Sequence, residues 1–183
     1  MVITHVAVAL LLAVPVAVVA PEFATAAAVG AVVGGIAPDL DMFVGSHRRT
    51  LHFPVAGSIL AVPAVALALV APAPATVAVA VGASAAAVHS ASDVLGAGEE
   101  LRPWERTNPN AVYDHVSGRW WRARYVVPYD GSRRDLLVAV LAAAPALVVY
   151  DGTVRWLLVG LLCVGGAYTL FRRRLVPLFE RLV

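Results

Sequence analysis

Six long apolar runs constrain this chain more than any other feature of its sequence. They cover residues 6–20, 23–37, 53–71, 75–95, 136–150 and 154–171. Hydrophobic residues make up 60% of the chain, whereas a soluble domain is about 45–50% apolar. A helix that spans a membrane needs about 20 apolar residues, with a usual range of 17–25. The pattern predicts an all-α polytopic membrane bundle of about six transmembrane helices, with residues 1–183 forming one domain.

Three of the runs, at 6–20, 23–37 and 136–150, are short for a full span. We expect them to cross the membrane by including residues at the interface, and the alternative is that some are re-entrant or interfacial. The first run also has the length of the apolar part of a signal peptide, whose cleavage would remove His5. No Arg or Lys precedes this run and a second apolar run follows at once, which favours a retained helix.

The arginines orient the predicted bundle. All 14 basic residues other than histidine are Arg. If six spans alternate in direction, every arginine except Arg155 falls on the side where the chain begins. The positive-inside rule makes this side cytoplasmic. We therefore expect a cell-membrane protein with both termini and the polar loop 96–134 in the cytoplasm.

The same topology brings the chemically versatile side chains to the cytoplasmic side. It places there the acids of the turn Pro38-Asp39-Leu40-Asp41, and also Asp93. It also places there all five histidines, which are His5, His47, His52, His89 and His115. The single cysteine, Cys163, lies within an apolar run, so it offers neither an intrachain disulfide nor a thiolate cluster for zinc.

His89 and Asp93 are four residues apart on a predicted helix, so their side chains share one face about 5–6 Å apart. The pair can share a metal ion, or the aspartate can orient the histidine. The simpler alternative is a buried polar pair that ties helices together. Ionisable groups at membrane depth are costly and therefore indicate function by default.

The remaining candidates are weaker one by one. Asp39 and Asp41 can chelate one ion or bridge two, or they can be solvated acids where a helix ends. His47 and His52 are five residues apart and converge only if the chain turns between them. The alternative for His47 is a basic loop that faces lipid head groups, and for His5 an interfacial histidine.

Together these residues predict a metal site. Nitrogen and oxygen ligands without cysteine suit Zn²⁺, Mn²⁺ or Fe²⁺ better than they suit a structural thiolate site, and Zn²⁺ is the metal that we expect. A metal held in this way activates water for hydrolysis, and Asp39 or Asp41 would be the catalytic residue that accepts the proton. The predicted metal ligands are His5, Asp39, Asp41, His47, His52, His89 and Asp93.

The polar loop combines arginine with aromatic residues in the stretch Arg119-Trp120-Trp121-Arg122. This pattern indicates an interfacial segment. The segment would either capture an anionic substrate such as a phosphoester or anchor the chain to anionic membrane lipid. Acids interspersed along the loop disfavour nucleic acid as a partner. Asp114, His115 and Asp130 are either further site residues or parts of ordinary turns, and Asp130-Gly131 favours a turn.

The ordered motifs resemble the YdjM-type family of inner-membrane metal-dependent hydrolases. They are Thr4-His5, the stretch from Gly34 to Asp41, His47-Arg48 with His52, and His89 with Asp93, while Leu101-Arg102-Pro103-Trp104 and Tyr129-Asp130-Gly131-Ser132 resemble archaeal members. The family is similar in pattern to zinc-dependent phospholipase C and P1-type nucleases. The resemblance implies His5, Asp39, His52, His89 and Asp93 as metal ligands. This chain departs from the family pattern in having Leu51 and Phe53 where Thr and Ser usually flank the second histidine.

These observations favour a membrane-bound, metal-dependent hydrolase that acts on a phosphoester or other ester at the cytoplasmic membrane face. The substrate would be a small molecule or a lipid phosphoester. Two alternatives from other classes are a metal-ion carrier or sensor and a non-enzymatic membrane scaffold. The carrier is disfavoured because five of the six apolar runs have almost no polar residues at mid-membrane depth.

Overall fold

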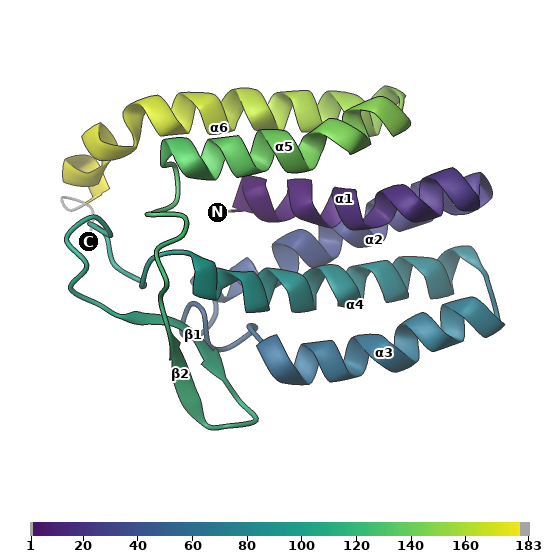
Figure 1. Ribbon diagram of the computed structural model, residues 1–183, viewed down its shortest axis with the longest axis horizontal. Coiled ribbons are helices and arrows are strands. Elements are labelled where there is room, and N and C mark those ends of the chain that lie inside the picture. The colour runs from purple at the N-terminus through teal and green to yellow at the C-terminus, as the bar shows by residue number, and fades with distance from the viewer. Residues whose placement is uncertain (1, 180–183) are drawn as a thin grey trace.

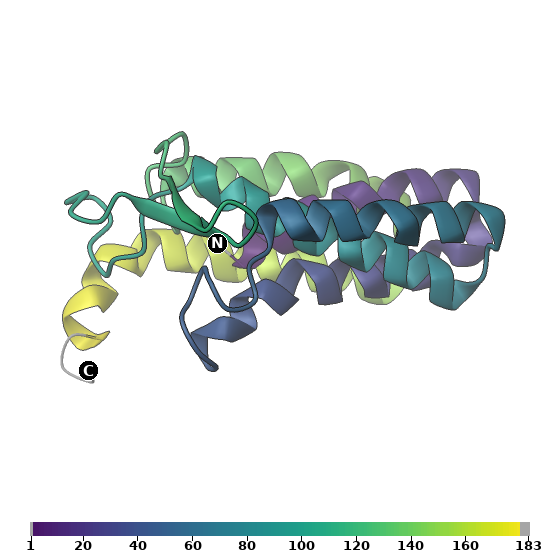
Figure 2. The ribbon, with the colours of Figure 1, turned by 90° about the horizontal axis from the view of Figure 1, so that it is seen from below.

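The computed structural model describes residues 2–179. These residues form six α-helices that lie side by side, with a small β-hairpin at one end of the bundle (Figures 1 and 2). The helices are α1 (Val2–Val19), α2 (Ala24–Ile36), α3 (Pro54–Val70), α4 (Pro74–Ser92), α5 (Arg133–Val149) and α6 (Gly152–Phe179). The predicted all-α bundle is confirmed as the architecture.

Short 3-10 segments extend two of the helices and carry acids of the predicted site. The segment η2 (Ala37–Met42) continues α2 and contains Asp39 and Asp41, and η3 (Asp93–Leu95) continues α4. A third segment, η1 (Pro21–Phe23), joins α1 to α2. Pro54 and Pro74 begin α3 and α4, which suits proline because the first helical residue needs no hydrogen-bond donor.

Four segments within residues 2–179 are long and apolar enough to cross a membrane. They are Val2–Val19, Pro21–Met42, Pro74–Leu95 and Gly152–Pro177. The helices α3 and α5 have 17 residues each, which corresponds to roughly 26 Å against a hydrocarbon core of about 30 Å. Length and composition therefore support four of the six expected spans, and full spanning by α3 and α5 stays a prediction.

Helix α1 lies between α2 and α4 on one side and α5 on the other, and its buried face centres on Val6, Leu10 and Ala13. Helices α2 and α4 pack with their backbones in contact. A Cβ atom at Gly34 would overlap the carbonyl oxygen of Gly82. Such close approach is typical of small residues in membrane helices. It fixes the end of α2, and with it Asp39, relative to the end of α4.

The β-hairpin within the polar loop was not expected from the sequence. Strands β1 (Asn110–Asp114) and β2 (Arg119–Arg122) pair antiparallel, with Tyr113 opposite Trp120. The hairpin lies at the end of the bundle where α1 begins and α6 ends (Figure 1). Its Tyr113 backbone N–H donates to the carbonyl of Arg48 over 2.9 Å. The hairpin therefore braces the loop that leads from η2 to α3.

Candidate metal centre

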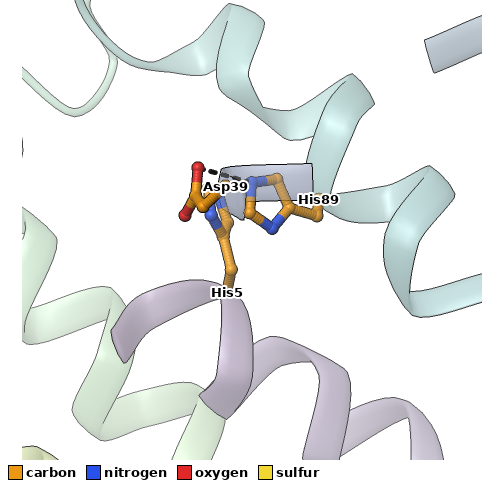
Figure 3. Close-up of side chains that lie close together, drawn as sticks. All are labelled: His5, Asp39 and His89. Carbon is orange, nitrogen blue, oxygen red and sulfur yellow. Dashed lines mark ion pairs between the residues drawn. The ribbon is translucent and has the colours of Figure 1, made fainter. Parts of the chain in front are cut away.

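Five side chains from five separate segments form a buried cluster near one end of the bundle. His5 comes from α1, Asp39 from η2, His52 from the residues before α3, His89 from α4, and Asp93 from η3. Each of these residues is at most 8% exposed. Figure 3 shows His5, Asp39 and His89 converging from different elements. The structure thus brings together the five residues that the family resemblance implies as ligands.

The Nε2 atom of each of the three imidazoles faces a carboxylate oxygen. His89 Nε2 lies 3.3 Å from Asp39 Oδ1, and His52 Nε2 lies 3.2 Å from Asp93 Oδ2. His5 Nε2 lies 3.4 Å from the other oxygen of Asp93, and its ring packs against that of His89 with centroids 3.6 Å apart. These mixed nitrogen and oxygen donors point into one small volume.

Two overlapping groups of three residues have the spacing of a metal site. They are His5 with Asp39 and His89, and His52 with His89 and Asp93, and within each group the possible ligand atoms lie within 4.8 Å of one another. A group of buried His and Asp side chains at this spacing can hold a metal ion. Oxygen and imidazole ligands are compatible with several divalent transition metals.

Hydrogen bonds on the far side of two imidazoles set their tautomers. His89 Nδ1 lies 2.8 Å from the carbonyl oxygen of Gly35, which can only accept, so Nδ1 donates and carries the proton. His52 Nδ1 lies 2.8 Å from Asp41 Oδ2 and donates in the same way. In each neutral imidazole, Nε2 then presents a lone pair to the cluster. Metal-binding histidines in proteins are commonly oriented by such partners.

The cluster contains buried polar atoms that have no hydrogen-bond partner among the described residues. They are Nε2 of His5, His52 and His89, Nδ1 of His5, and one oxygen each of Asp39 and Asp93. A buried polar atom without a partner is costly. Lone pairs that face carboxylates also repel unless a proton or a cation lies between them. The donor set therefore fits a bound cation.

The single free nitrogen of His89 favours one shared ion. Both groups of ligands include His89, and its Nδ1 is already bound to Gly35. Only Nε2 is left to coordinate, and one lone pair serves one ion. Two ions that each took His89 as a ligand would conflict, so the geometry favours one ion that draws on both groups.

Asp41 and His47 lie directly behind the cluster. Asp41 accepts hydrogen bonds from His52 and the Leu51 backbone through Oδ2, and from His47 Nδ1 through Oδ1 over 2.8 Å. Burial works to lower the pKa of His52, but the hydrogen bonds and negative charges of Asp93 and Asp41 outweigh it and raise that pKa. Both predicted ligands therefore contact the site, with the oxygens of Asp41 occupied in orienting His52 and His47.

Arg48 places a positive charge beside the cluster. Its Nε lies 4.0 Å from Asp93 Oδ2, and Nη1 donates to the carbonyl of Ala97 over 2.5 Å. Its backbone has a φ of 58°, which is uncommon for a residue other than glycine and is often found at functional sites. The hydrogen bond from Tyr113 holds this conformation. Arg48, which follows His47 in the chain, is thus held at the edge of the site.

The other candidates lie away from the cluster. His115 is exposed on the hairpin, where its Nε2 donates to the carbonyl of Arg49 over 2.6 Å and its ring packs against Phe53. Asp114 closes the hairpin turn by accepting from the backbone of Val116 and Ser117. These hydrogen bonds are those of an ordinary turn.

Two contacts in and beside the site were not predicted from the sequence. The carbonyl of Gly35 orients His89, and a backbone atom leaves no signal in residue type. Asp130, which was left open, pairs with Arg172 of α6 over 3.5 Å and accepts from Tyr168 over 2.7 Å. The helical periodicity of α6 puts residues 168 and 172 on one face, and this is the one sequence signal for that contact.

Comparisons of the chain with protein-family models, curated proteins and solved structures found no match. The chemistry of the site therefore has to be inferred from its own residues.

Proposed function

We propose that this protein is a membrane-bound, metal-dependent hydrolase that cleaves a phosphoester or other ester with metal-activated water. The observation that carries the proposal is the convergence of three histidine Nε2 atoms on two buried carboxylates, with His89 and His52 held from behind by hydrogen bonds to Gly35 and Asp41. The resemblance to metal-dependent membrane hydrolases points the same way.

The residues of the site would have separate roles. His5, Asp39, His52, His89 and Asp93 would hold the ion, and Zn²⁺ is the metal that we expect. A divalent metal at such a site acts as a Lewis acid and lowers the pKa of a bound water to about 7. Asp39 keeps Oδ2 without a hydrogen-bond partner, so of the two predicted bases it has an oxygen ready to accept the proton.

Arg48 would act on the substrate. Hydrolysis of a phosphoester builds negative charge on the phosphoryl oxygens, and a fixed guanidinium nearby stabilises that charge. Arg48 is held by the carbonyls of Ala97 and Ala111, so little reorganisation is needed when the charge develops. Its proximity to Asp93 places it within reach of a substrate at the site.

We also propose that all six helices cross the membrane and that the site faces the cytoplasm. Support comes from the arginines, which concentrate on the side of the bundle where α1 begins. His5 lies near the start of α1, and His89 and Asp93 lie near the end of α4. A site at this depth meets both water and the polar part of the lipid. Cysteine accessibility in intact cells at residues 46 and 72, which lie in successive loops, tests the orientation.

Elemental analysis and a chelation assay test the proposed function. Protein purified in detergent without chelator should contain about one divalent metal ion per chain. It should hydrolyse a soluble activated phosphodiester, lose this activity on removal of the metal, and regain it when Zn²⁺ is returned. A protein with no bound metal would favour the scaffold alternative, and bound metal without hydrolysis but with flux in proteoliposomes would favour the carrier.

A further inference from the structure

A cavity of about 630 Å³ adjoins the candidate metal centre. It lies among α1, α5, α6 and the loop after η3, and Asp39, His47 and Arg48 form part of its wall. Its volume is within the range of about 300–1,000 Å³ that is typical of small-molecule sites. The cavity is therefore the space from which a substrate can reach the proposed metal ion.

One wall of this cavity is apolar. It is formed by Ile3 of α1, Leu136 and Ala139 of α5, and Val164 and Gly165 of α6. Val164 is 60% exposed, and it belongs to the candidate span Gly152–Pro177. The apolar wall thus continues onto a helix surface that faces lipid if α6 crosses the membrane. A water-soluble substrate would gain nothing from this wall, whereas a hydrocarbon chain would bury apolar surface against it.

Arg172 provides the cavity with a second cation, and this one is buried. It is 7% exposed, its Nη2 donates to the carbonyl of Leu101 over 3.2 Å, and the same nitrogen lies 3.5 Å from Asp130 Oδ1. Its Nε is buried and has no hydrogen-bond partner within the described part of the chain. A guanidinium that keeps a free donor suits the oxygens of a phosphate group.

Three of the acids that line the cavity accept hydrogen bonds from neighbouring groups. Asp130 accepts from Tyr168, and Asp135 accepts from Thr4 and from the Gly131 backbone. Glu100 accepts from Thr107 through Oε2 but keeps Oε1 buried without a partner. A ligand that forms hydrogen bonds with both Arg172 Nε and Glu100 Oε1 would carry an anionic phosphate for the arginine and a hydroxyl donor for the glutamate.

The polar and apolar parts of the cavity are arranged along the axis of α6. Arg172 and Val164 are eight residues apart, which is roughly 12 Å of helix rise. Arg172 lies near the cytoplasmic end of the proposed span, at the level where charged and aromatic side chains meet head groups. The apolar wall lies deeper. This order matches the order of head group and acyl chain in a membrane lipid.

We propose that this cavity binds a phospholipid whose anionic, hydroxyl-bearing head group contacts Arg172 and Glu100 and whose acyl chain lies along the apolar wall between α1, α5 and α6. The lipid is the substrate if the proposed hydrolase function holds, because the head group then lies next to Asp39 and Arg48. The inference therefore names the substrate class of the proposed function, and lipid binding can be measured without turnover.

Photo-crosslinking of the full chain in neutral detergent micelles tests the inference. The probe is phosphatidylglycerol with a photoactivatable group in one acyl chain, and the comparison probe is the matching phosphatidylcholine. Labelling by phosphatidylglycerol should map to α5 and α6 and should exceed that by phosphatidylcholine. Glycerol phosphate, which has the head-group chemistry but no chain, should compete only weakly, because it gains nothing from the apolar wall.

Two variants of α6, each with a matched control, separate the head-group contact from the chain contact. Arg172→Gln should lower labelling about tenfold, the loss expected for one charge-assisted hydrogen bond, whereas Arg173→Gln should not. Gly165→Leu should also reduce labelling, since a Cβ at Gly165 already contacts Ile3 at 3.5 Å and the larger side chain enters the cavity. Gly160→Leu is its control, because a Cβ there meets nothing within 4 Å.

The outcomes distinguish this inference from the proposed function. Equal labelling by the two lipids, or labelling that neither Arg172→Gln nor Gly165→Leu reduces in a folded protein, would overturn the lipid site. In that case metal-dependent hydrolysis of a soluble phosphodiester would still support the hydrolase. Selective labelling in a protein without metal-dependent hydrolysis would instead overturn the hydrolase function and leave the lipid site standing.

Discussion

Residues 2–95 and the α5–α6 pair (residues 133–179) are built from similar small and aliphatic side chains, but they pack differently. Gly30 and Gly34 bring the backbone of α2 into contact with α4. By contrast, a Cβ atom added at Gly160 or Gly166 of α6 would meet no other atom within 4 Å. All five side chains of the candidate metal centre come from residues 2–95. Close backbone contact thus accompanies the segments that carry the ligands, whereas α6 is largely exposed and contributes part of the cavity wall.

The largest expected effect comes from removing a ligand from the tightly packed part. His89→Ala should reduce bound metal below about one tenth of the wild-type content, because His89 belongs to both candidate ligand groups and metal affinity depends on the ligand count. Elemental analysis measures this loss. His115→Ala is the matched control, since His115 is exposed and bonds to the Arg49 carbonyl. Unchanged metal in His89→Ala would contradict the proposed centre.

A glycine substitution between α2 and α4 tests whether close packing positions the ligands. Gly34→Ala should destabilise the protein by about 1–3 kcal/mol, as expected for overpacking, because the new Cβ overlaps the Gly82 carbonyl. It should weaken metal binding as well, since Asp39 follows α2 and His89 lies near the end of α4. Thermal unfolding and metal titration measure the two effects. Gly160→Ala should change neither the thermal stability nor the metal affinity. If the two variants behaved alike, the proposed difference in packing between the two regions would be wrong.

The residue behind His52 should have a smaller effect than the ligands. Asp41→Asn keeps the shape of the side chain but weakens the acceptor for His52 Nδ1. We expect the metal dissociation constant to rise about 10–100-fold, as is typical for partners that orient a metal ligand. Competition with a chromophoric chelator gives the constant. Complete loss of metal would instead make Asp41 a direct ligand, as the sequence analysis predicted.

Proton competition should make metal binding depend on pH. The pKa of His52 is raised, so pairing of its cation with Asp41 and Asp93 stabilises the metal-free fold below the unfolded pKa, and this stabilisation is lost as the pH rises through the folded value. A metal ion needs the neutral imidazole. The rise in Tm on adding Zn²⁺ should therefore be larger at about pH 8 than at about pH 6. An equal rise at both values would count against His52 as a ligand.

The smallest effect is expected where the two regions meet. Thr4 Oγ1 donates to Asp135 Oδ1 over 2.5 Å and links α1 to α5. Thr4→Val should lower the free energy of unfolding by about 1 kcal/mol, the usual contribution of one hydrogen bond. The metal affinity should change less than about twofold, because Asp135 is not part of the cluster. A large loss of metal in this variant would show that α5 helps to hold the site.

Sequence reasoning anticipated part of the candidate site. The spacing of His89 and Asp93 on one helix and the motif around Asp39 both lead to residues that the structure places together. It gave no means of separating Asp41 from Asp39, since both acids follow Pro38 in the same turn. The 3-10 segment η2 separates them, because it directs Asp39 towards His89 and Asp41 towards His52 and His47.

The sequence by itself determined that long apolar segments form helices and that the ionisable residues lie at their ends, because burial of charge in lipid is costly and hydrophobic patterning is a local property of the chain. Tertiary structure decided which nitrogen of each histidine faces the cluster, how Arg48 and Arg172 come to line one cavity, and where the hairpin braces the loop. Those outcomes depend on contacts between residues far apart in the chain, such as Gly35 with His89, and no local pattern encodes them.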